Sequence, residues 1–409
     1  MISREHYLTK IQAGFQYNPI VVLIGARQVG KTTLMEMYVK EKQNLWLNGQ
    51  NPETAQFFEK FSTIERYLKI NINEELNGLL VIDEFQYVND ISLILKLFVD
   101  KYKNLRILCS GSSSLEIVQK VEESLAGRIR LINVYSLSFS EFVKFQNSEL
   151  SENFNKCKFD DNINILFPQL PILLNEYLLY GGLPKVALAG DFAEKEELLS
   201  DIFKTYLLKD VRQYIKNQDF VAFNKLLKIL AAQTGNLLNI NEISNTIQLA
   251  YKTCEEYINI LEQMFIIQLI NPFTSNLRKE ITKRKKIFFY DLGLRNIIYN
   301  SFNDIYIRTD NGQIFENYVF LQLLQDYKQS QICFYRTKDA TEIDFIISEK
   351  NNKIIPIEVK FKEFKNHKKI RAISEFSKNV EIEKSYIINR NLIENNEDQF
   401  YMQPYVLHL

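Results

Sequence analysis

One octapeptide limits what this chain can fold into more than any other stretch of the sequence. GARQVGKT, residues 25–32, follows the apolar run IVVLI and precedes a segment with the apolar spacing of an amphipathic helix. It matches GxxxxGK[ST], a loop that functions only between a buried strand and a helix. Such a strand–loop–helix unit is built into an open, mostly parallel sheet. The sequence therefore predicts an α/β domain in its first third.

Each residue type in this loop has a physical role. Gly25 and Gly30 let the backbone turn its N–H groups toward phosphate oxygens at the positive end of the following helix. Lys31 would place a charge on the β and γ phosphates, and Thr32 would offer a hydroxyl to Mg²⁺. We therefore expect ATP and Mg²⁺ as cofactors. The residues expected to surround the nucleotide are Gly25, Ala26, Arg27, Gln28, Val29, Gly30, Lys31, Thr32 and Thr33.

A second strand supplies acidic groups for the same site. In GLLVIDEFQYV, residues 79–82 form the apolar run of a central parallel strand, and Asp83 and Glu84 follow at its carboxyl end. Ligands gather at that end of the strands in open α/β sheets. We expect Asp83 to hold Mg²⁺, directly or through water, and Glu84 to orient or deprotonate the attacking water. The pair predicts ATP hydrolysis.

The order of several motifs resembles one family. GARQVGKTTL, VIDEFQYV, SGSSS, LAGR and LSFSEF are similar to those of prokaryotic AAA-type ATPases that carry a C-terminal domain of uncertain function. YGGLPKVAL and YLLKDV, at 180–188 and 206–211, resemble linker helices of that family. The resemblance spans nearly the whole chain. It implies an AAA-type P-loop ATPase domain over 1–150 and a helical lid over 151–220, in agreement with the helical apolar spacing of the latter segment.

The resemblance also implies further residues at the nucleotide. Ser112, with Ser113 beside it, would be the polar sensor near the γ-phosphate, although a solvated Ser/Gly turn would have the same sequence. Arg128 or Arg130 would act as an arginine finger or sensor. The alternative is an ordinary surface arginine at the start of a strand. An arginine that acts on a neighbouring copy would require an oligomer.

Residues 221–291 read as three short helices and a hairpin, the element order of a winged helix-turn-helix. The expected wing is basic and could neutralise several DNA phosphates. Glu255 and Glu256 on the third helix, next to Lys252, would repel the DNA backbone, and winged helices also bind proteins. Both a DNA and a protein partner remain open. The basic residues of this hairpin, 278–286, are Arg278, Lys279, Lys283, Arg284, Lys285 and Lys286.

The last segment, 292–409, contains charges inside an apolar hairpin. EIDFIISEKNNKIIPIEVK, residues 342–360, has the alternation of two paired strands. Glu358 and Lys360 project to the same side, and Asp344 would face them from the partner strand. Buried charges are costly unless they are paired or bind a metal. A hairpin with its charges on a solvated face would explain one such residue more easily than several.

This spacing resembles the restriction-endonuclease-like, or PD-(D/E)XK, fold, an α/β domain. The resemblance implies that Asp344 and Glu358 bind Mg²⁺, that Lys360 positions the water or stabilises negative charge, and that Glu316 is an auxiliary acid. Ile343 stands where the family pattern has Pro. A domain of this fold can also be a catalytically inactive binding platform. Tyr335 and Arg336, on the strand before, could contact a phosphate.

Bulk composition restricts the remaining choices. Fifty basic and fifty acidic residues cancel, which excludes binding to nucleic acid through net charge alone. The N-terminus does not resemble a signal peptide, and the apolar runs are too short for a membrane span, so we expect a cytoplasmic protein. The first hypothesis is an ATPase whose nucleotide state controls a Mg²⁺-dependent nuclease acting on DNA. The alternatives are an ATP-dependent switch or interaction protein and, with less support, a small-molecule kinase.

Overall fold

The computed structural model describes most of the chain. It covers residues 2–112, 125–157, 160, 162–212, 214–216, 219–274, 284–337, 339, 341–349, 353–396 and 399–405, with the backbone alone at 112 and 206–210. Contacts divide it into two compact units, Met1–Tyr135 with Gln263–Phe265, and Ser136–Glu262 with Ile266–Leu409. The sequence predicts four segments. The second and fourth lie entirely in the second unit, as does the third apart from Gln263–Phe265, and residues 136–150 of the first segment join them.

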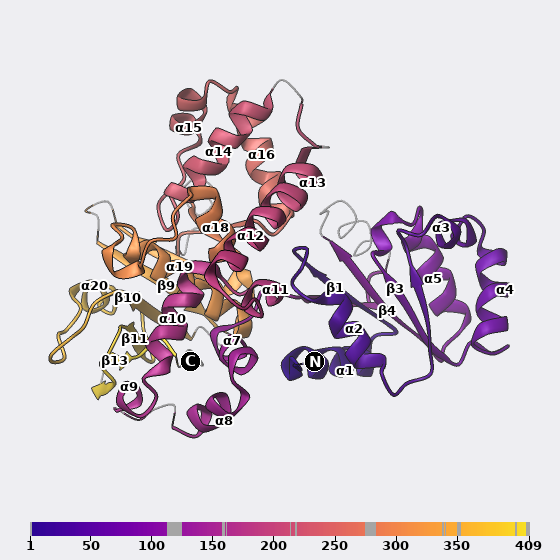
Figure 1. Cartoon of the computed structure of the whole chain (residues 1–409), viewed down its shortest axis with the longest axis horizontal. Helices are drawn as coiled ribbons and strands as arrows, with labels where there is room; N and C mark the ends of the chain where they lie inside the picture. Colours follow the sequence, from indigo (N-terminus) through magenta and orange to yellow (C-terminus); the bar gives the residue numbers. More distant parts are fainter. Residues whose placement is uncertain are drawn as a thin grey trace. The chain divides into compact units, whose positions relative to one another are not determined.

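The first unit is built on a parallel sheet with strand order β2-β3-β4-β1-β5. Its central strands are buried on both faces, as their continuous apolar runs require. The register places Gly25 beside Ser112 and Asn48 beside Asp83, so these positions share the carboxyl edge of the sheet. Figure 1 labels β1, β3 and β4 of this sheet. The strands are β1 Ile20–Gly25, β2 Asn44–Asn48, β3 Gly78–Asp83, β4 Leu105–Ser112 and β5 Ile129–Asn133.

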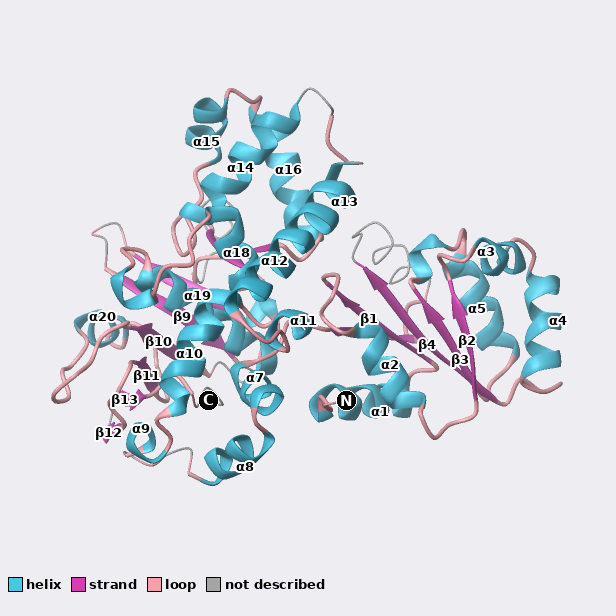
Figure 2. Cartoon of the chain, viewed as in Figure 1, coloured by secondary structure: helices cyan, strands magenta, loops and turns pink. Residues whose placement is uncertain are grey.

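Helices cover both faces of this sheet (Figure 2). On one face Leu68 and Phe98, from α4 and α5, share a core with Leu80 and Ile107 of the strands. On the other face α1 and α2 contact β1. The sequence thus folds as the α/β unit that its first motif predicts. The helices are α1 Glu5–Tyr17, α2 Lys31–Val39, α3 Pro52–Phe58, α4 Phe61–Asn71, the 3-10 turn η1 Phe85–Tyr87 and α5 Ile91–Lys101.

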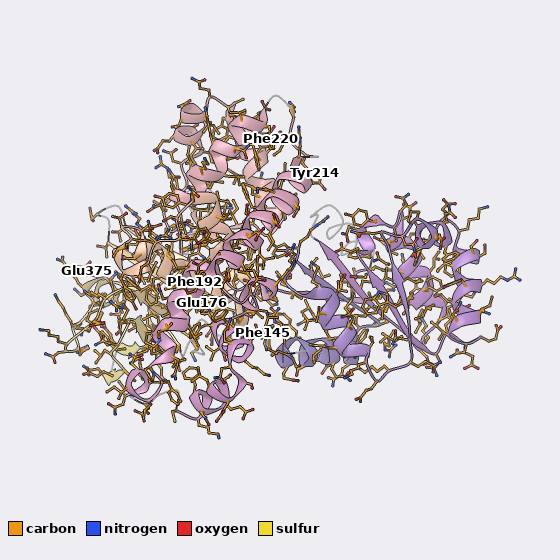
Figure 3. The ribbon with its side chains drawn as sticks, in the orientation of Figure 1. Phe145, Glu176, Phe192, Tyr214, Phe220 and Glu375 are labelled. Carbon is orange, nitrogen blue, oxygen red and sulfur yellow. The ribbon has the colours of Figure 1, made fainter. Side chains whose placement is uncertain are left out.

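The second unit begins with a helical segment. Glu176 on α10 pairs with the buried Lys195 of α12 at 3.2 Å, and Phe192 stacks on Tyr180, so α10 and α12 are locked together (Figure 3). Here the helices are α7 Phe139–Gln146, α8 Ser148–Lys156, α9 Ile163–Leu166, α10 Gln169–Tyr180, α11 Pro184–Ala187, α12 Phe192–Ile202, the π-helix η2 Phe203–Leu208 and α13 Lys209–Arg212.

Three helices and an antiparallel strand pair follow, in the order expected for 221–291. They are α14 Phe220–Ala232, α15 Ile240–Ile247, α16 Tyr251–Gln263, β6 Ile267–Ile270 and β7 Lys286–Phe289. The chain after β6 joins the edge of the next sheet, because Phe334 N donates to Asn271 O at 3.1 Å. This pairing explains why the segment shares a unit with the C-terminal residues.

The C-terminal sheet has the strand order β12-β13-β11-β10-β9-β8. Strands β8, β9 and β10 form an antiparallel meander that contains the predicted hairpin, whereas β11 runs parallel to β10. Phe320 of α19 stacks on Phe345 from one face, and Phe376 of α20 packs on Tyr335 from the other. The elements are α18 Leu292–Tyr299, η4 Ile305–Ile307, α19 Asn311–Asp326, η5 Gln329–Gln331, β8 Ile332–Arg336, β9 Glu342–Ser348, β10 Ile354–Val359, α20 Arg371–Phe376, β11 Ser385–Ile388, β12 Glu394–Asn396 and β13 Gln399–Met402. Across the residues that the structure describes, no helix combines the length and the apolar character needed to cross a membrane.

Candidate functional site

The loop between β1 and α2 is shaped by close backbone approaches. A Cβ at Gly25 would lie 2.1 Å from Val134 O, so only glycine fits at the end of β1. Gly30 and Gln28 have φ values of 91° and 63°, in the left-handed region that turns the backbone sharply. Arg4 NH1 donates to Val29 O at 3.0 Å, a hydrogen bond that helps to hold the loop in place. The sequence reasoning missed this last contact because Arg4 lies 25 residues away.

Lys31 begins α2 and turns back over the loop. Its Nζ donates to Gly25 O at 2.9 Å and to Ala26 O at 2.8 Å, and the residue is buried. Burial lowers the pKa of Lys31 to about 8, although the nearby Glu84 and Asp83 carboxylates oppose the shift. A poorly solvated cation of this kind gains strongly from an approaching anion.

Asp83, at the end of β3, connects the loop to the neighbouring strand. Its Oδ2 accepts a hydrogen bond from Thr32 Oγ1 at 3.0 Å, and its Oδ1 accepts one from Ser110 Oγ. Ser110 Oγ also accepts from Glu84 N at 3.2 Å. A hydroxyl and a carboxylate side by side form a donor set that suits Mg²⁺. The expected Thr32 and Asp83 are thus brought together.

Ser110 was not among the sequence candidates. The expected Ser112 ends β4, but its side chain lies outside the described residues, as does all of Ser113. The pairing of Ile82 with Cys109 places Asp83 next to Ser110. Once this register is known, the serine two positions before Ser112 is the one that meets the carboxylate.

Glu84 follows directly and is held in a constrained turn. Its φ of 52° is left-handed, and its side chain accepts a hydrogen bond from Gln86 Nε2. Arg27 of the loop donates to Tyr87 OH at 3.2 Å, which connects the loop to the same turn. The structure therefore gathers Lys31, Thr32, Asp83 and Glu84 at one edge of the sheet.

Arg128 does not join this cluster. Ile20 N donates to Arg128 O at 3.2 Å, so Arg128 precedes β5 at the amino edge of the sheet, one strand length away from the loop. Five residues of strand correspond to about 16 Å. Its guanidinium pairs with Asp100, with Nε 2.8 Å from Oδ1. Within one chain, the expectation that Arg128 contacts the nucleotide is wrong. Arg130 is exposed on β5.

A second cluster lies in the C-terminal sheet. Lys360 Nζ is 2.5 Å from Glu358 Oε1 and 3.9 Å from Asp344 Oδ2. Val359 N donates to Asp344 Oδ2 at 2.8 Å. We call the hollow of about 460 Å³ above these residues the carboxylate pocket. Side chains that line it include Glu316 of α19, Arg336 of β8, Glu342 and Asp344 of β9, and Lys360.

Glu358 has an unsatisfied oxygen. The residue is 6% exposed, and its Oε2 has no hydrogen-bond partner among the described residues. Burial and the neighbouring Asp344 raise the pKa of Glu358, whereas Lys360 opposes the shift. An orphaned carboxylate oxygen beside a second carboxylate fits a divalent cation. In the described ranges, however, no group of three or more His, Cys, Asp or Glu side chains is arranged to hold a metal ion.

Lys286 explains why Glu316 does not complete such a group. Its Nζ lies 2.8 Å from Glu316 Oε1, 2.5 Å from Glu342 Oε1 and 3.9 Å from Asp344 Oδ1. The residue is 1% exposed in β7. Burial alone would lower the pKa of Lys286, but Glu316, Asp344 and Glu342 raise it above its ordinary value. The ammonium group is therefore a charged member of the cluster.

The position of Lys286 corrects the expectation that all the basic residues of the 278–286 hairpin could contact DNA. Lys286 is not available to a DNA phosphate, because it is buried among carboxylates. Arg284 is exposed and Lys285 is half-buried, while Arg278, Lys279 and Lys283 lie outside the described residues. On α16, Glu255 and Glu256 are exposed, as is Lys252.

Two further candidates separate onto opposite faces of β8. Arg336 NH1 lies 2.8 Å from Glu342 Oε2 and lines the carboxylate pocket. Tyr335 instead packs on Phe376 with ring centroids 4.7 Å apart, so it does not face the pocket and the expectation that it contacts a phosphate there is wrong. Ile343 is completely buried, and its place in the pattern is therefore a core position.

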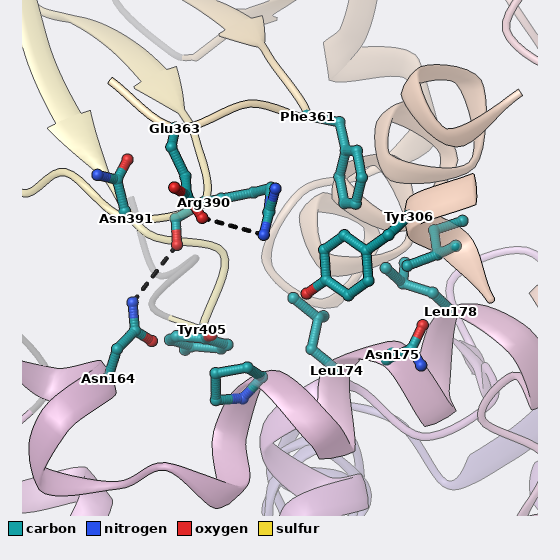
Figure 4. Close-up of a pocket in the computed structure, with 12 residues that line it drawn as sticks. Asn164, Leu174, Asn175, Leu178, Tyr306, Phe361, Glu363, Arg390, Asn391 and Tyr405 are labelled. Atoms are coloured by element: carbon teal, nitrogen blue, oxygen red, sulfur yellow. Dashed lines mark hydrogen bonds and ion pairs between the residues drawn. The ribbon is translucent and has the colours of Figure 1, made fainter. Parts of the chain in front are cut away.

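A smaller hollow of about 230 Å³ lies between α10 and the loops after β10 and β11. Arg390 is stacked over Tyr306, 4.5 Å from the ring centroid, and pairs with Glu363 at 3.1 Å (Figure 4). Asn164 Nδ2 donates to Arg390 O at 3.5 Å. Arg390 is thus committed to contacts within the protein.

The fold and the first site define a class of protein. A parallel sheet whose phosphate-type loop follows β1 and whose acidic pair follows β3 is the arrangement of a P-loop ATPase. Residues 17–143 match the model of an AAA domain. The N-terminal part of the chain is accordingly a P-loop ATPase domain of the AAA type. Residues 172–304 and 311–405 match two domains of unknown function, DUF8612 and DUF4143.

Several proteins are similar to this chain. An uncharacterized protein of Methanocaldococcus jannaschii is 23% identical over 94% of this chain and 83% of its own length. Another, from Haemophilus influenzae, is 26% identical over 88% of this chain and 87% of its own length. Among solved structures, the Walker-type ATPase of Pyrococcus abyssi is 17% identical, covers 73% of this chain and 96% of its own, and has a TM-score of 0.49.

Proposed function

We propose that the protein binds Mg-ATP at the β1–α2 loop and hydrolyses it. One observation carries this proposal: the Asp83 carboxylate joins Thr32 of the loop to Ser110 of β4. A carboxylate held between two hydroxyls has a defined orientation before any ligand arrives. Such preorganisation is the main protein contribution to phosphoryl transfer.

Each residue would have a separate part in turnover. The loop N–H groups and Lys31 would bind the phosphates, while Thr32 and Asp83 would hold Mg²⁺, which neutralises phosphate charge when bound. Glu84 would orient the attacking water and accept its proton. Ser110 would fix the Asp83 carboxylate and the Glu84 backbone, which makes it a positioning residue rather than a catalytic one.

Two substitutions separate binding from hydrolysis. Lys31→Ala should remove ATP binding, measured by calorimetry, because the phosphates lose their cation. Glu84→Gln should keep ATP affinity but reduce phosphate release by at least about a hundredfold, as expected when a general base is lost. The control is Glu36→Gln on the exposed face of α2. Unchanged turnover in Glu84→Gln would remove Glu84 from this role.

The C-terminal part has a second candidate function, a nuclease-like domain that acts on DNA under control of ATP. It is favoured by the orphaned Glu358 Oε2 beside Asp344 and Lys360. The order α19–β8–β9–β10–α20–β11, with β10 parallel to β11, is consistent with the restriction-endonuclease-like fold suggested by the sequence spacing. Bound Mg²⁺ would activate water and stabilise charge at the scissile phosphate. Asp344 and Glu358 would be its ligands, and Lys360 would hold the anionic oxygen.

Cleavage has a direct test. Wild-type protein with Mg²⁺ and ATP should nick supercoiled plasmid, and Lys360→Ala should not, although its ATP hydrolysis should be unchanged. Lys365→Ala, at an exposed position five residues further on, is the matched control. If neither wild type nor the control nicks plasmid with Mg²⁺, Mn²⁺ or Co²⁺, the C-terminal part is not a nuclease.

The outcome without cleavage would favour an ATP-dependent switch with a catalytically inactive C-terminal platform. The observation that favours this alternative is the ammonium group of Lys286 among the acids. A switch should retain a partner in the Glu84→Gln variant with ATP and release it in Lys31→Ala. DNA, a protein partner and a second copy of the chain can each be offered in that experiment. Arg284 is the exposed basic residue that the structure describes in the proposed DNA-contacting hairpin.

A further inference from the structure

We propose that the ammonium group of Lys286 takes the place of a divalent cation beside the carboxylate pocket, so that this cluster of acids accepts a single metal ion, between Asp344 and Glu358. Glu316 then serves as a partner of Lys286 and not as a metal ligand. The metal part of this inference depends on the proposed C-terminal site. The other part, that the Lys286 ammonium group occupies the place of a second cation, does not depend on that proposed site.

The position of Lys286 is fixed by its backbone. Strand β7 pairs with β6 on one side, where Ile270 faces Lys286. On the other side Leu237 bridges to Lys286, and Leu238 N donates to Lys285 O at 2.8 Å. Pairing along both edges fixes the backbone of Lys286, and burial of the side chain and two close ion pairs hold its ammonium group beside the carboxylates.

The ammonium also occupies the oxygens that a metal would need. Glu316 Oε1 and Glu342 Oε1 lie 2.8 and 2.5 Å from Nζ. A Mg²⁺ ion requires oxygen ligands at about 2.1 Å and would be repelled by the neighbouring charge. Lys286 therefore occupies Glu316 Oε1 and Glu342 Oε1, the two oxygens nearest to it.

Asp344 and Glu358 differ from these two acids. Asp344 Oδ1 is 3.9 Å from Lys286 Nζ, beyond hydrogen-bond distance. Glu358 Oε2 is buried without a partner among the described residues. Asp344 lines the carboxylate pocket, and Glu358 directly precedes Val359 of its lining. Both carboxylates lie within 4 Å of Lys360, so they share this cation and their charge is not fully compensated.

The test is Mn²⁺ binding without nucleotide, measured by calorimetry and by electron paramagnetic resonance of free Mn²⁺. Wild type, Lys286→Gln, Glu316→Gln and Glu358→Gln are compared, with Arg284→Gln as the control for loss of an exposed cation on the same segment. The ATP site lies in the other unit and contributes equally to every variant. Circular dichroism reports whether each variant is folded.

Three results would support the proposal. Lys286→Gln should bind one more Mn²⁺ than wild type, and Arg284→Gln should not. Glu316→Gln, which keeps a hydrogen-bond acceptor for Lys286, should leave the Mn²⁺ dissociation constant within about threefold of wild type. Glu358→Gln should weaken binding by about tenfold or more, the scale seen when groups at a metal site are lost.

The opposite pattern would overturn it. A tenfold loss of Mn²⁺ affinity in Glu316→Gln would make Glu316 a metal ligand, and this result is available even if Lys286→Gln does not fold. A folded Lys286→Gln protein without additional Mn²⁺ would be equally decisive. If wild type binds no Mn²⁺ in the C-terminal part but Lys286→Gln gains one ion, the proposed metal site fails and the role of Lys286 stands.

Discussion

At the scale of single residues, the nucleotide site depends on a hydroxyl to which the sequence motif assigns no role, that of Ser110, the first residue of SGSSS. Ser110→Ala removes the donor to Asp83 and the acceptor for Glu84 N. We expect ATP affinity to change little and turnover to fall by roughly ten- to a hundredfold, the usual cost of losing a group that orients a metal ligand. Steady-state phosphate release measures the effect. Ser112→Ala should cost less, and a larger loss in Ser112→Ala would return the sensor role to Ser112.

Lys31 predicts a pH dependence of nucleotide binding. Burial lowers its pKa to about 8 without ATP, and the phosphates of ATP should raise it again. Below pH 8 the lysine is already charged, so affinity should be nearly constant. Above pH 8 binding must take up a proton, and the affinity should fall by up to about tenfold per pH unit. Calorimetry between pH 7 and 9.5, in two buffers of different ionisation enthalpy, would detect that proton. An affinity that stays constant to pH 9.5 would contradict the proposed contact.

The sequence could predict residues whose role depends on neighbours along the chain. Gly30, Lys31 and Thr32 are consecutive at the start of α2, and Asp83 and Glu84 stand at the end of β3, so the local motif and the end of the apolar run are sufficient to predict them. It could not predict residues that depend on register or packing. Ser110 meets Asp83 only through the pairing of β3 with β4. Lys286 reaches Glu316 across 30 residues, and its sequence context is that of a basic hairpin.

At the scale of elements, LSFSEF acts as a helix start. Ser138 Oγ accepts from Glu141 N at 3.2 Å, and Glu141 Oε2 accepts from Ser138 N at 3.0 Å, so the two residues form a capping box for α7. Ser138→Ala should destabilise the second unit by about 1 kcal/mol. Urea unfolding followed by circular dichroism measures the change.

The matched control for this cap is Ser140→Ala, inside α7 and outside the capping box, which should stay within about 0.5 kcal/mol of wild type. The single tryptophan, Trp46, lies in β2 of the first unit. Its fluorescence should therefore report the same midpoint in wild type and Ser138→Ala. Equal midpoints for both variants by circular dichroism would mean that the cap contributes little to the second unit.

Element boundaries were predictable where periodicity is local. The β9–β10 hairpin and the strand before the loop appear where apolar alternation and apolar runs place them. The face on which each side chain packs is harder to predict from the sequence. Tyr335 and Arg336 are adjacent, yet one faces α20 and the other the carboxylate pocket, because β8 alternates between two covered faces.

At the scale of the whole molecule, two compact units share one chain. The sequence indicated more segments because helical, hairpin and sheet patterns succeed one another after residue 150. Local pattern does not show that Asn271 and Phe334 pair, which joins the middle segment to the C-terminal sheet. Long-range pairing of this kind follows from the complete fold and determines how many cooperative units the protein has.

Control of the C-terminal part by ATP requires that nucleotide binding to the first unit changes the stability of the second unit. A non-hydrolysable ATP analogue at a hundred times its dissociation constant should stabilise the first unit by about 2.7 kcal/mol, detected as a shift in Trp46 fluorescence melting. If nucleotide state controls the C-terminal part, the second unit should shift as well, by a coupling free energy on the order of 1–3 kcal/mol, seen by calorimetry as movement of its own transition. Lys31→Ala should remove both shifts, because it removes the ligand. If the first transition moves while the second stays fixed, the proposed ATPase stands but ATP does not control the C-terminal part. The reason is that a ligand shifts an equilibrium only as far as it binds the two states differently.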